Sequence, residues 1–360
     1  MRRLRDLWMR DPYLVSLRDV EDAGAPGSGP LASKDALPAG LDAARKNGKL
    51  FWLYGTTDKP PDNVGNPYSE FPGIGFNCYC SEDLETWEGP FPAFRRPEGF
   101  WADTQFWAPE VYVYRGRLIM FATMKKSGKP NERGVVVLES PGARPEGPFV
   151  PITSGPTTPP SWSCLDGTLH VEDGVPYMVF CREWTQVGDG EMCAMRLSPA
   201  LAQAAAAPFT LFSASQASWC KSFNSSSTSR QGNYITDGPF MHRCASTGEL
   251  IMLWSSRGRN DNYCVGIARS SSGKLKGPWV HDASPLFQRD GGHAMLARVG
   301  LQRSTGSSSS AFAPSSHSLL IMALHSPNRQ VRKSSPKLFG VIEERDQATG
   351  RAHFDWFEFL

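Results

Sequence analysis

Five short apolar segments recur along the chain, each after a turn rich in glycine or polar residues. They lie roughly 60 to 75 residues apart, the kind of fixed interval that marks a repeated structural unit. Short apolar runs bounded by turn residues are typical of buried β-strands. The repeat therefore predicts five similar β units, centred on Gly48–Thr56, Gly116–Thr123, Gly174–Cys181, Gly248–Ser255 and Ser318–His325.

Each apolar segment is preceded by a second short segment and followed by a third. Radial repetition of such strand units builds a β-propeller, in which the first strand of every blade lines a central channel. We therefore expect an all-β, five-bladed β-propeller. The expected innermost strands are Asp11–Val15, Ala108–Tyr112, Asp166–His170, Asp237–Met241 and Gly292–Leu296; the expected third strands are Ile74–Cys80, Gly134–Leu138, Glu191–Met195, Cys264–Ala268 and Leu338–Ile342.

The five units span nearly the whole chain, which predicts a single propeller domain over residues 1–360. Residues from about 21 to 44, which include Ala25-Pro26-Gly27-Ser28-Gly29-Pro30, are predicted to form a flexible loop insertion within the first blade. Short runs of alanine or serine at 204–207, 225–227 and 307–310 are predicted to be surface excursions.

Charge and composition restrict the partners. A net charge of +2 with scattered basic residues gives no case for nucleic acid. There is no run of about 18 apolar residues, so a membrane span is excluded. The eight cysteines stand singly in expected strands and indicate buried thiols rather than a disulfide framework. The basic start, residues 1–10, lacks the apolar core of a secretory signal and is predicted to lead into the first strand.

The chemistry is expected at the starts of the innermost strands, which offer Asp11, Glu110, Asp166, Asp237 and His293. Equivalent positions of a radial repeat face the same end of the channel, so these groups are expected to converge. Carboxylates held close together titrate apart, one protonated while another is ionised. General acid–base catalysis uses such a pair.

An inverting glycosidase needs one carboxylate to activate water and one carboxylic acid to protonate the leaving oxygen. Groups on different blades across a narrow channel meet this requirement. Flat aromatic side chains near these acids are candidates for stacking on sugar rings, and the sequence offers Trp101, Phe106, Trp107, Trp162 and Trp184. Together these features favour a pocket that cleaves carbohydrates.

Five motifs in order resemble the signature of glycoside hydrolase family 43. They are Arg10-Asp11-Pro12-Tyr13-Leu14, Trp107-Ala108-Pro109-Glu110-Val111-Tyr112, Leu165-Asp166-Gly167-Thr168-Leu169, Thr236-Asp237-Gly238-Pro239-Phe240 and Gly291-Gly292-His293-Ala294-Met295. The resemblance extends from Asp11 to Phe357. It implies a five-bladed propeller that hydrolyses arabinose-, xylose- or galactose-containing glycans with inversion.

The resemblance also implies residue roles. Asp11 matches the general base and Asp166 the carboxylate that orients the acid and raises its pKa. The family's general acid is a glutamate in a Glu-Gly-Pro motif, and Asp237 stands at this place here. Because aspartate is one methylene shorter, Glu183 is the first alternative acid and Glu191 the second. No cofactor is required, although His293 matches a histidine that holds a metal ion or its waters in many members, with calcium the plausible ion.

The remaining candidates are expected to contact sugar or to support the site. Trp101, Trp107, Glu183 and His293 are candidate substrate contacts, Glu110 is expected to be structural or to contact sugar, and His325 to be structural. Three functions stay open: an exo-acting α-L-arabinofuranosidase or β-xylosidase, a glycan-binding propeller without catalysis, and a protein-interaction propeller of the kelch kind. The expected partner is an oligo- or polysaccharide, the expected state a monomer, and the family resemblance suggests a secreted or periplasmic location.

Overall fold

Five antiparallel sheets form the structure, a computed structural model that describes residues 1–17, 37–129, 132–300 and 318–359. The sheets are successive in sequence, and in each one the strands follow chain order from the inside outwards. Their innermost strands contact one another around a common axis. The fold is a five-bladed β-propeller, as the strand repeat predicted.

The blades have the following strands. Blade 1 contains β2 (Arg10–Ser16), β3 (Phe51–Thr56), β4 (Gly75–Ser81) and β5 (Thr86–Arg95), with β1 (Arg2–Arg3) added to its outer edge. Blade 2 contains β6 (Thr104–Tyr114), β7 (Arg117–Lys125), β8 (Arg133–Ser140) and β9 (Val150–Pro151). Blade 3 contains β10 (Cys164–Glu172), β11 (Val175–Arg182), β12 (Glu191–Arg196) and β13 (Phe209–Ser213).

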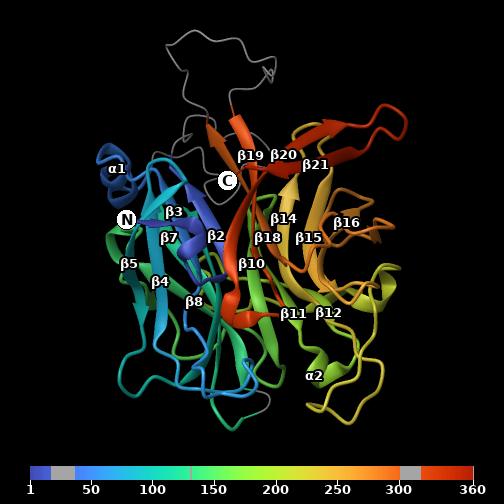
Figure 1. The fold of residues 1–360 in the computed structure, drawn as a ribbon, viewed down its shortest axis with the longest axis horizontal. Coiled ribbons are helices and arrows are strands. Elements are labelled where there is room, and N and C mark those ends of the chain that lie inside the picture. The colour runs from blue at the N-terminus through green and yellow to red at the C-terminus, as the bar shows by residue number, and fades with distance from the viewer. Residues whose placement is uncertain (18–36, 130–131, 301–317, 360) are drawn as a thin grey trace.

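Blade 4 contains β14 (Asp237–Arg243), β15 (Leu250–Arg257), β16 (Tyr263–Ser270) and β17 (Trp279–His281). Blade 5 contains β18 (Gly292–Gly300), β19 (Ser318–Ser326), β20 (Ser335–Arg345) and β21 (Ala352–Glu358). Figure 1 shows blade 1 in blue on the left and blade 4 in yellow and orange on the right. The five expected innermost strands correspond to β2, β6, β10, β14 and β18.

Helices are few and short. The described part of the chain contains two α-helices, α1 (Ala39–Lys46) and α2 (Trp184–Val187). It also contains separate 3₁₀ turns at Leu4–Asp6, Pro141–Ala143, Ala214–Gln216 and Val331–Lys333. The helix α1 corrects the prediction that residues 21–44 form a loop throughout, because its buried Leu41 and Ala44 give it an apolar face that packs on the protein. Residues 18–36 and 307–310 lie outside the described residues, whereas 204–207 and 225–227 lie in connections, as predicted.

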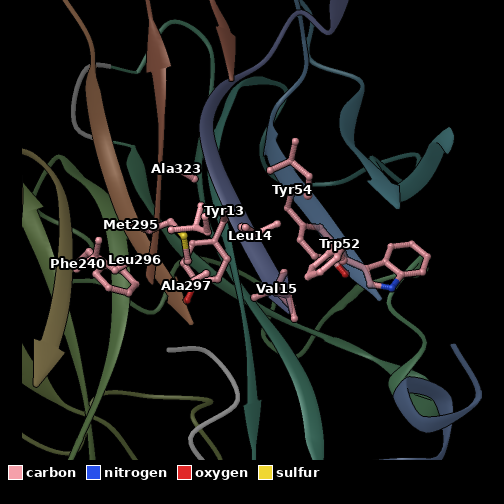
Figure 2. Close-up of a cluster of buried hydrophobic side chains, with 14 of the residues drawn as sticks. Tyr13, Leu14, Val15, Trp52, Tyr54, Phe240, Met295, Leu296, Ala297 and Ala323 are labelled. Atoms are coloured by element: carbon pink, nitrogen blue, oxygen red, sulfur yellow. The ribbon is translucent and has the colours of Figure 1, made fainter. Parts of the chain in front are cut away.

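Large apolar side chains fill the space between blades. Figure 2 shows Tyr13, Leu14 and Val15 of β2 between Trp52 and Tyr54 of β3 and Met295 and Ala297 of β18. All these side chains are almost fully buried. Burying one large apolar side chain contributes about 1.5–3 kcal/mol, so the packing of adjacent blades holds the innermost strands in place.

No described strand of blade 1 pairs within the sheet of blade 5, or the reverse. Side-chain contacts between these two blades therefore close the ring. Trp8 donates its indole N–H to the carbonyl of Val331 at 2.9 Å. Arg10 donates to Asn328 Oδ1 at 2.7 Å and to Ser334 Oγ at 3.2 Å. The closure therefore depends on side chains next to Asp11. None of the helices in the described part of the chain has both the length and the apolar character needed to span a bilayer.

Candidate active site

Every innermost strand carries a β-bulge near its start. In blade 1, Arg10 pairs with Thr56 and Tyr13 with Tyr54, so β2 has one more residue than β3 between these two pairs. The same shift occurs in the other four blades. The first residue inside each bulge has positive φ, between 46° and 55°: Asp11, Ala108, Asp166, Gly238 and His293. For a non-glycine residue this conformation costs about 1–2 kcal/mol, a cost typical of functional positions.

The bulges correct the expectation that five chemical groups occupy equivalent positions. Asp11, Asp166 and His293 are equivalent, but Asp237 lies one residue before the bulge residue of its blade and Glu110 lies two residues after it. Because successive residues of a strand point to opposite faces of the sheet, an offset of one residue changes the face to which a side chain points. The five groups therefore do not form one ring.

The backbone amide of each bulge residue donates to the preceding blade. Four of these amides donate to a side chain near the end of the preceding blade's second strand. The pairs are Ala108 to Thr56 at 2.8 Å, Asp166 to Thr123 at 2.8 Å, His293 to Ser255 at 2.8 Å and Asp11 to His325 Nδ1 at 3.1 Å. In blade 3 the equivalent side chain is Cys181, a weak acceptor. The amide of Gly238 donates instead to Asp166 Oδ2 at 2.9 Å.

Asp11 lies among cationic and polar groups. Its Oδ1 is 3.3 Å from Nδ1 of His293 and 3.2 Å from Nδ1 of His325, and its Oδ2 accepts from Thr56 Oγ1 at 2.6 Å. Burial raises the pKa of Asp11, but His293, His325 and Arg10 outweigh this and hold it below its ordinary value. Asp11 is therefore ionised near neutral pH.

The two histidines beside Asp11 have different roles. His325 is fully buried; its Nδ1 accepts the Asp11 amide at 3.1 Å, and its Nε2 lies 3.0 Å from Asn328 Oδ1. Burial lowers the pKa of His325, whereas its contacts with Asp11 raise it. His293 has its Nδ1 between two carboxylates, Asp11 Oδ1 and Asp166 Oδ2 at 3.6 Å. This nitrogen therefore faces two carboxyl groups from different blades.

Asp166, Asp237 and Glu183 form the opposite, carboxylate-rich side of the site. Burial raises the pKa of Asp166, and Asp11 and Glu183 raise it further. Burial likewise raises the pKa of Asp237, with Asp166 and Glu183 adding to the effect. Of these two aspartates, Asp166 has the backbone donor from Gly238, whereas Asp237 accepts a hydrogen bond from the phenol of Tyr263 at 3.0 Å and from no other described residue. The arrangement therefore favours the proton on Asp237.

Glu183 is held by an ion pair with Arg133. Its Oε2 accepts from Arg133 Nη1 at 2.6 Å and from Thr185 Oγ1 at 2.5 Å, and its side chain is almost fully buried. Arg133 is itself fixed by Gln105 Oε1 and lies over the ring of Trp107. Two donors therefore engage the same oxygen of Glu183. Glu191 forms an ion pair with Arg182 and does not line the pocket.

A cavity of about 430 Å³ opens beside these groups and is lined by Asp11, Asp166, Asp237, Glu183 and His293. This size is typical of pockets for small ligands. Aromatic side chains form its walls: Trp8, Tyr68, Phe71, Trp107, Trp184, Phe223 and Tyr263. Trp107 and Trp184 are thus placed where sugar stacking was expected.

Four other candidates do not line this cavity. Trp101 packs against Phe100, and Phe106 is buried between Phe76 and Phe94. Trp162 lies under the guanidinium of Arg182. Glu110 is buried, accepts from the hydroxyl of Tyr112, and has its pKa raised by burial to about 7. Glu110 is therefore a buried residue of the packing. Trp101, which was expected to contact sugar, does not line the cavity.

Comparisons with known proteins agree with this geometry. Residues 47–306 match the family model described as glycosyl hydrolases family 43. The chain belongs to this family. It is 31% identical to the crystal structure of an endo-arabinase from Bacteroides thetaiotaomicron VPI-5482, with a TM-score of 0.69, covering 94% of this chain and 96% of that one.

Two further relatives extend the comparison. Alpha-L-arabinofuranosidase 43 of Humicola insolens is 25% identical over 189 residues, which are 51% of this chain and 36% of that protein. The chain thus spans about a third of the length of this relative. An endo-1,4-beta-xylanase structure from Bacteroides thetaiotaomicron VPI-5482 shares the fold at 21% identity, with a TM-score of 0.58 and coverage of 98% and 95%.

The axial histidine of this family 43 glycoside hydrolase gives only partial support to a metal ion. Calcium prefers six to eight oxygen ligands, and Asp11 and Asp166 supply oxygens beside His293. However, Nδ1 of His293 already pairs with both carboxyl groups, at 3.3 and 3.6 Å. The residues at this nitrogen therefore fit a histidine–carboxylate pair better than a calcium site.

A second group of potential ligands lies at the far end of β14, where His242, Cys244 and Glu343 come together. Glu343 Oε2 bonds to His242 Nε2 at 2.8 Å, while Oε1 accepts from the amide and hydroxyl of Ser246 at 2.7 and 2.8 Å. Both carboxylate oxygens are therefore engaged. This group is a buried ion pair that joins blades 4 and 5.

Several residues of the site were not predicted from the sequence. His325 was expected to be structural, and Arg10, Thr56, Arg133 and Tyr263 were not among the candidates. One signal was available, because the acceptors Thr56, Thr123, Ser255 and His325 are the residues that end the repeated apolar segments. Arg133 and Tyr263 begin third strands, and nothing in the pattern distinguishes them.

Proposed function

We propose that this family 43 glycoside hydrolase cleaves α-L-arabinofuranosyl linkages in arabinose-containing glycans, with inversion at the anomeric carbon. The endo-arabinase and the α-L-arabinofuranosidase among its relatives support arabinose over xylose and galactose. The observation that carries the chemistry is the opposite environment of two carboxyl groups in one cavity. Asp11 is surrounded by His293, His325 and Arg10, whereas Asp237 is surrounded by carboxylates.

In the proposed reaction, Asp11 is the general base and Asp237 the general acid. Asp11 takes a proton from a water molecule as the water oxygen bonds to the anomeric carbon. The glycosidic C–O bond breaks, and the leaving oxygen receives the proton of Asp237. The two protons balance, and product release returns both carboxyl groups to their starting states through solvent.

Asp166 and His293 support this pair. The negative charge of Asp166 raises the pKa of Asp237, so that Asp237 keeps its proton until the leaving group needs it. The hydrogen bond from the Gly238 amide favours the anionic form of Asp166, and His293 lies between Asp166 and Asp11. Glu183 and Arg133 are proposed to form one wall for the bound sugar together with Trp107.

The test is hydrolysis of nitrophenyl α-L-arabinofuranoside, β-xyloside and galactoside beside α-1,5-linked arabino-oligosaccharides. We expect turnover of the arabinofuranosyl substrates, with proton NMR showing the inverted anomer as the first product. Exo action, expected for a pocket, gives arabinose as the first product, whereas endo action gives shorter oligosaccharides. Sugar binding without turnover of any substrate would contradict hydrolysis and support a glycan-binding propeller.

A further inference from the structure

Tyr263 contacts the proposed acid although it comes from a different strand. It is the first residue of β16, its side chain lines the cavity, and its hydroxyl donates to Asp237 Oδ2 at 3.0 Å. Burial and the nearby Asp237 raise the pKa of Tyr263 far above its ordinary value. The phenol therefore stays protonated and remains a donor.

The ring of Tyr263 is fixed on two sides. It stacks on the imidazole of His325, with ring centroids 5.7 Å apart and planes inclined by 21°. Gly292 provides the space for the ring on another side, because a Cβ there would lie 2.3 Å from Tyr263 Cε1. His325 in turn holds the amide of Asp11. One packed group thus orients both the base and the partner of the acid.

The hydrogen bond determines which oxygen of Asp237 carries the proton. Since Oδ2 accepts the phenol hydrogen, the transferable proton of Asp237 is on Oδ1. After the proton has left, the same phenol stabilises the carboxylate that remains. A short aspartate side chain, which is less able to adjust its reach than a glutamate, gains a defined orientation in this way.

We propose that Tyr263 is the positioning residue that allows an aspartate to act as the general acid in this enzyme. This inference rests on the function proposed above, and in particular on Asp237 as the acid. Tyr263 acts through Asp237 and does not itself transfer the proton.

The test compares wild type with Tyr263→Phe on two arabinofuranosides that differ in leaving group. Phenylalanine keeps the ring and its stacking and removes only the hydroxyl. On an arabino-oligosaccharide, whose leaving oxygen needs protonation, we expect kcat to fall about 10- to 100-fold. On dinitrophenyl arabinofuranoside, whose leaving group needs no acid, we expect less than about a threefold change. Loss of the phenol donor also shifts the alkaline limb of the oligosaccharide kcat/KM profile to higher pH.

Tyr114→Phe is the matched control. Tyr114 is 6% exposed, like Tyr263 at 7%, and its hydroxyl has no hydrogen-bond partner among the described residues. We expect this variant to match wild type on both substrates, and circular dichroism and Tm to show that both variants are folded. A Tyr263→Phe enzyme that equals wild type, or that loses the same factor on both substrates, overturns the inference. A wild type that turns over neither substrate overturns the proposed function itself, which distinguishes the two failures.

Discussion

The two sides of the cavity are built from the same repeated strand starts, yet the pKa values of their aspartates are shifted in opposite directions. On the blade 1 side, the pKa of Asp11 is held low by two histidines and an arginine. On the side of blades 3 and 4, burial and neighbouring carboxylates raise the pKa values of Asp166 and Asp237. The difference arises from the residues that the neighbouring blades place around each bulge, because the backbone conformation of the bulges is the same.

One position shows this most clearly, namely the residue near the end of each second strand that faces the bulge amide of the next blade. In blade 5 this residue is His325, which accepts the Asp11 amide and adds a ring beside its carboxylate. In blade 3 it is Cys181, which leaves the Gly238 amide free to hold Asp166. A difference at one equivalent position therefore accompanies the different surroundings of the proposed base, Asp11, and of Asp166.

The largest loss of activity is expected when Asp11, the proposed base, is replaced. Asp11→Asn keeps the shape of the side chain and removes its ability to take a proton, so kcat/KM on nitrophenyl arabinofuranoside should fall about 10²- to 10⁴-fold. The exposed Asp62 provides the control, and Asp62→Asn should leave kcat/KM unchanged. More than a tenth of wild-type activity in Asp11→Asn would rule out Asp11 as the base.

The acid side is tested by Asp237→Asn and Glu183→Gln. Asp237→Asn should lose about 10²-fold or more on arabino-oligosaccharides and far less on dinitrophenyl arabinofuranoside. Because Asp237 must be protonated and its pKa is raised, wild-type activity should be retained at neutral pH and fall as the pH rises further. Asp237→Asn should lack this alkaline decline. An active Asp237→Asn beside an inactive Glu183→Gln would transfer the acid role to Glu183.

A smaller effect is expected at the position that distinguishes the blades. Cys181→Ser provides a hydroxyl that competes with Asp166 for the Gly238 amide. Losing one hydrogen bond to a charged group raises the pKa of Asp166 and should lower kcat/KM about tenfold on arabino-oligosaccharides. Cys193→Ser, on the next strand of the same blade, is the control for replacing a buried thiol. Equal activities of the two variants would mean that the Cys181 position has no special role.

The smallest catalytic effect is expected at Thr123, which accepts the Asp166 amide on the neighbouring blade. Thr123→Val leaves that buried amide without its acceptor, which should lower the free energy of unfolding by about 1–3 kcal/mol. Urea denaturation measures this change. Since the carboxylate contacts of Asp166 remain, kcat/KM should change little, and a large catalytic loss with normal stability would contradict the structural role.

Much of the fold was predictable, since glycine-bounded apolar runs give the three inner strands of every blade. The convergence of Asp11, Asp166, Asp237 and His293 on one cavity also followed from the repeat. The displaced Glu110 and the offset of Asp237 did not, because a one-residue bulge reverses which side of a strand a residue faces and leaves no mark in the apolar pattern. Tyr263 and Arg133 were missed since they reach the cavity from third strands by the length of their side chains.

Carbon-13 NMR titration of aspartate carboxyl groups tests most directly whether the cavity holds one ionised and one protonated carboxyl group. Labelled wild type is compared with Asp11→Asn and Asp237→Asn, whose missing signals assign the two resonances. We expect the Asp11 signal to titrate below the ordinary aspartate range and the Asp237 signal above it. Ordinary titration of both residues, or an Asp11 that protonates before Asp237 as the pH falls, would contradict the proposed mechanism.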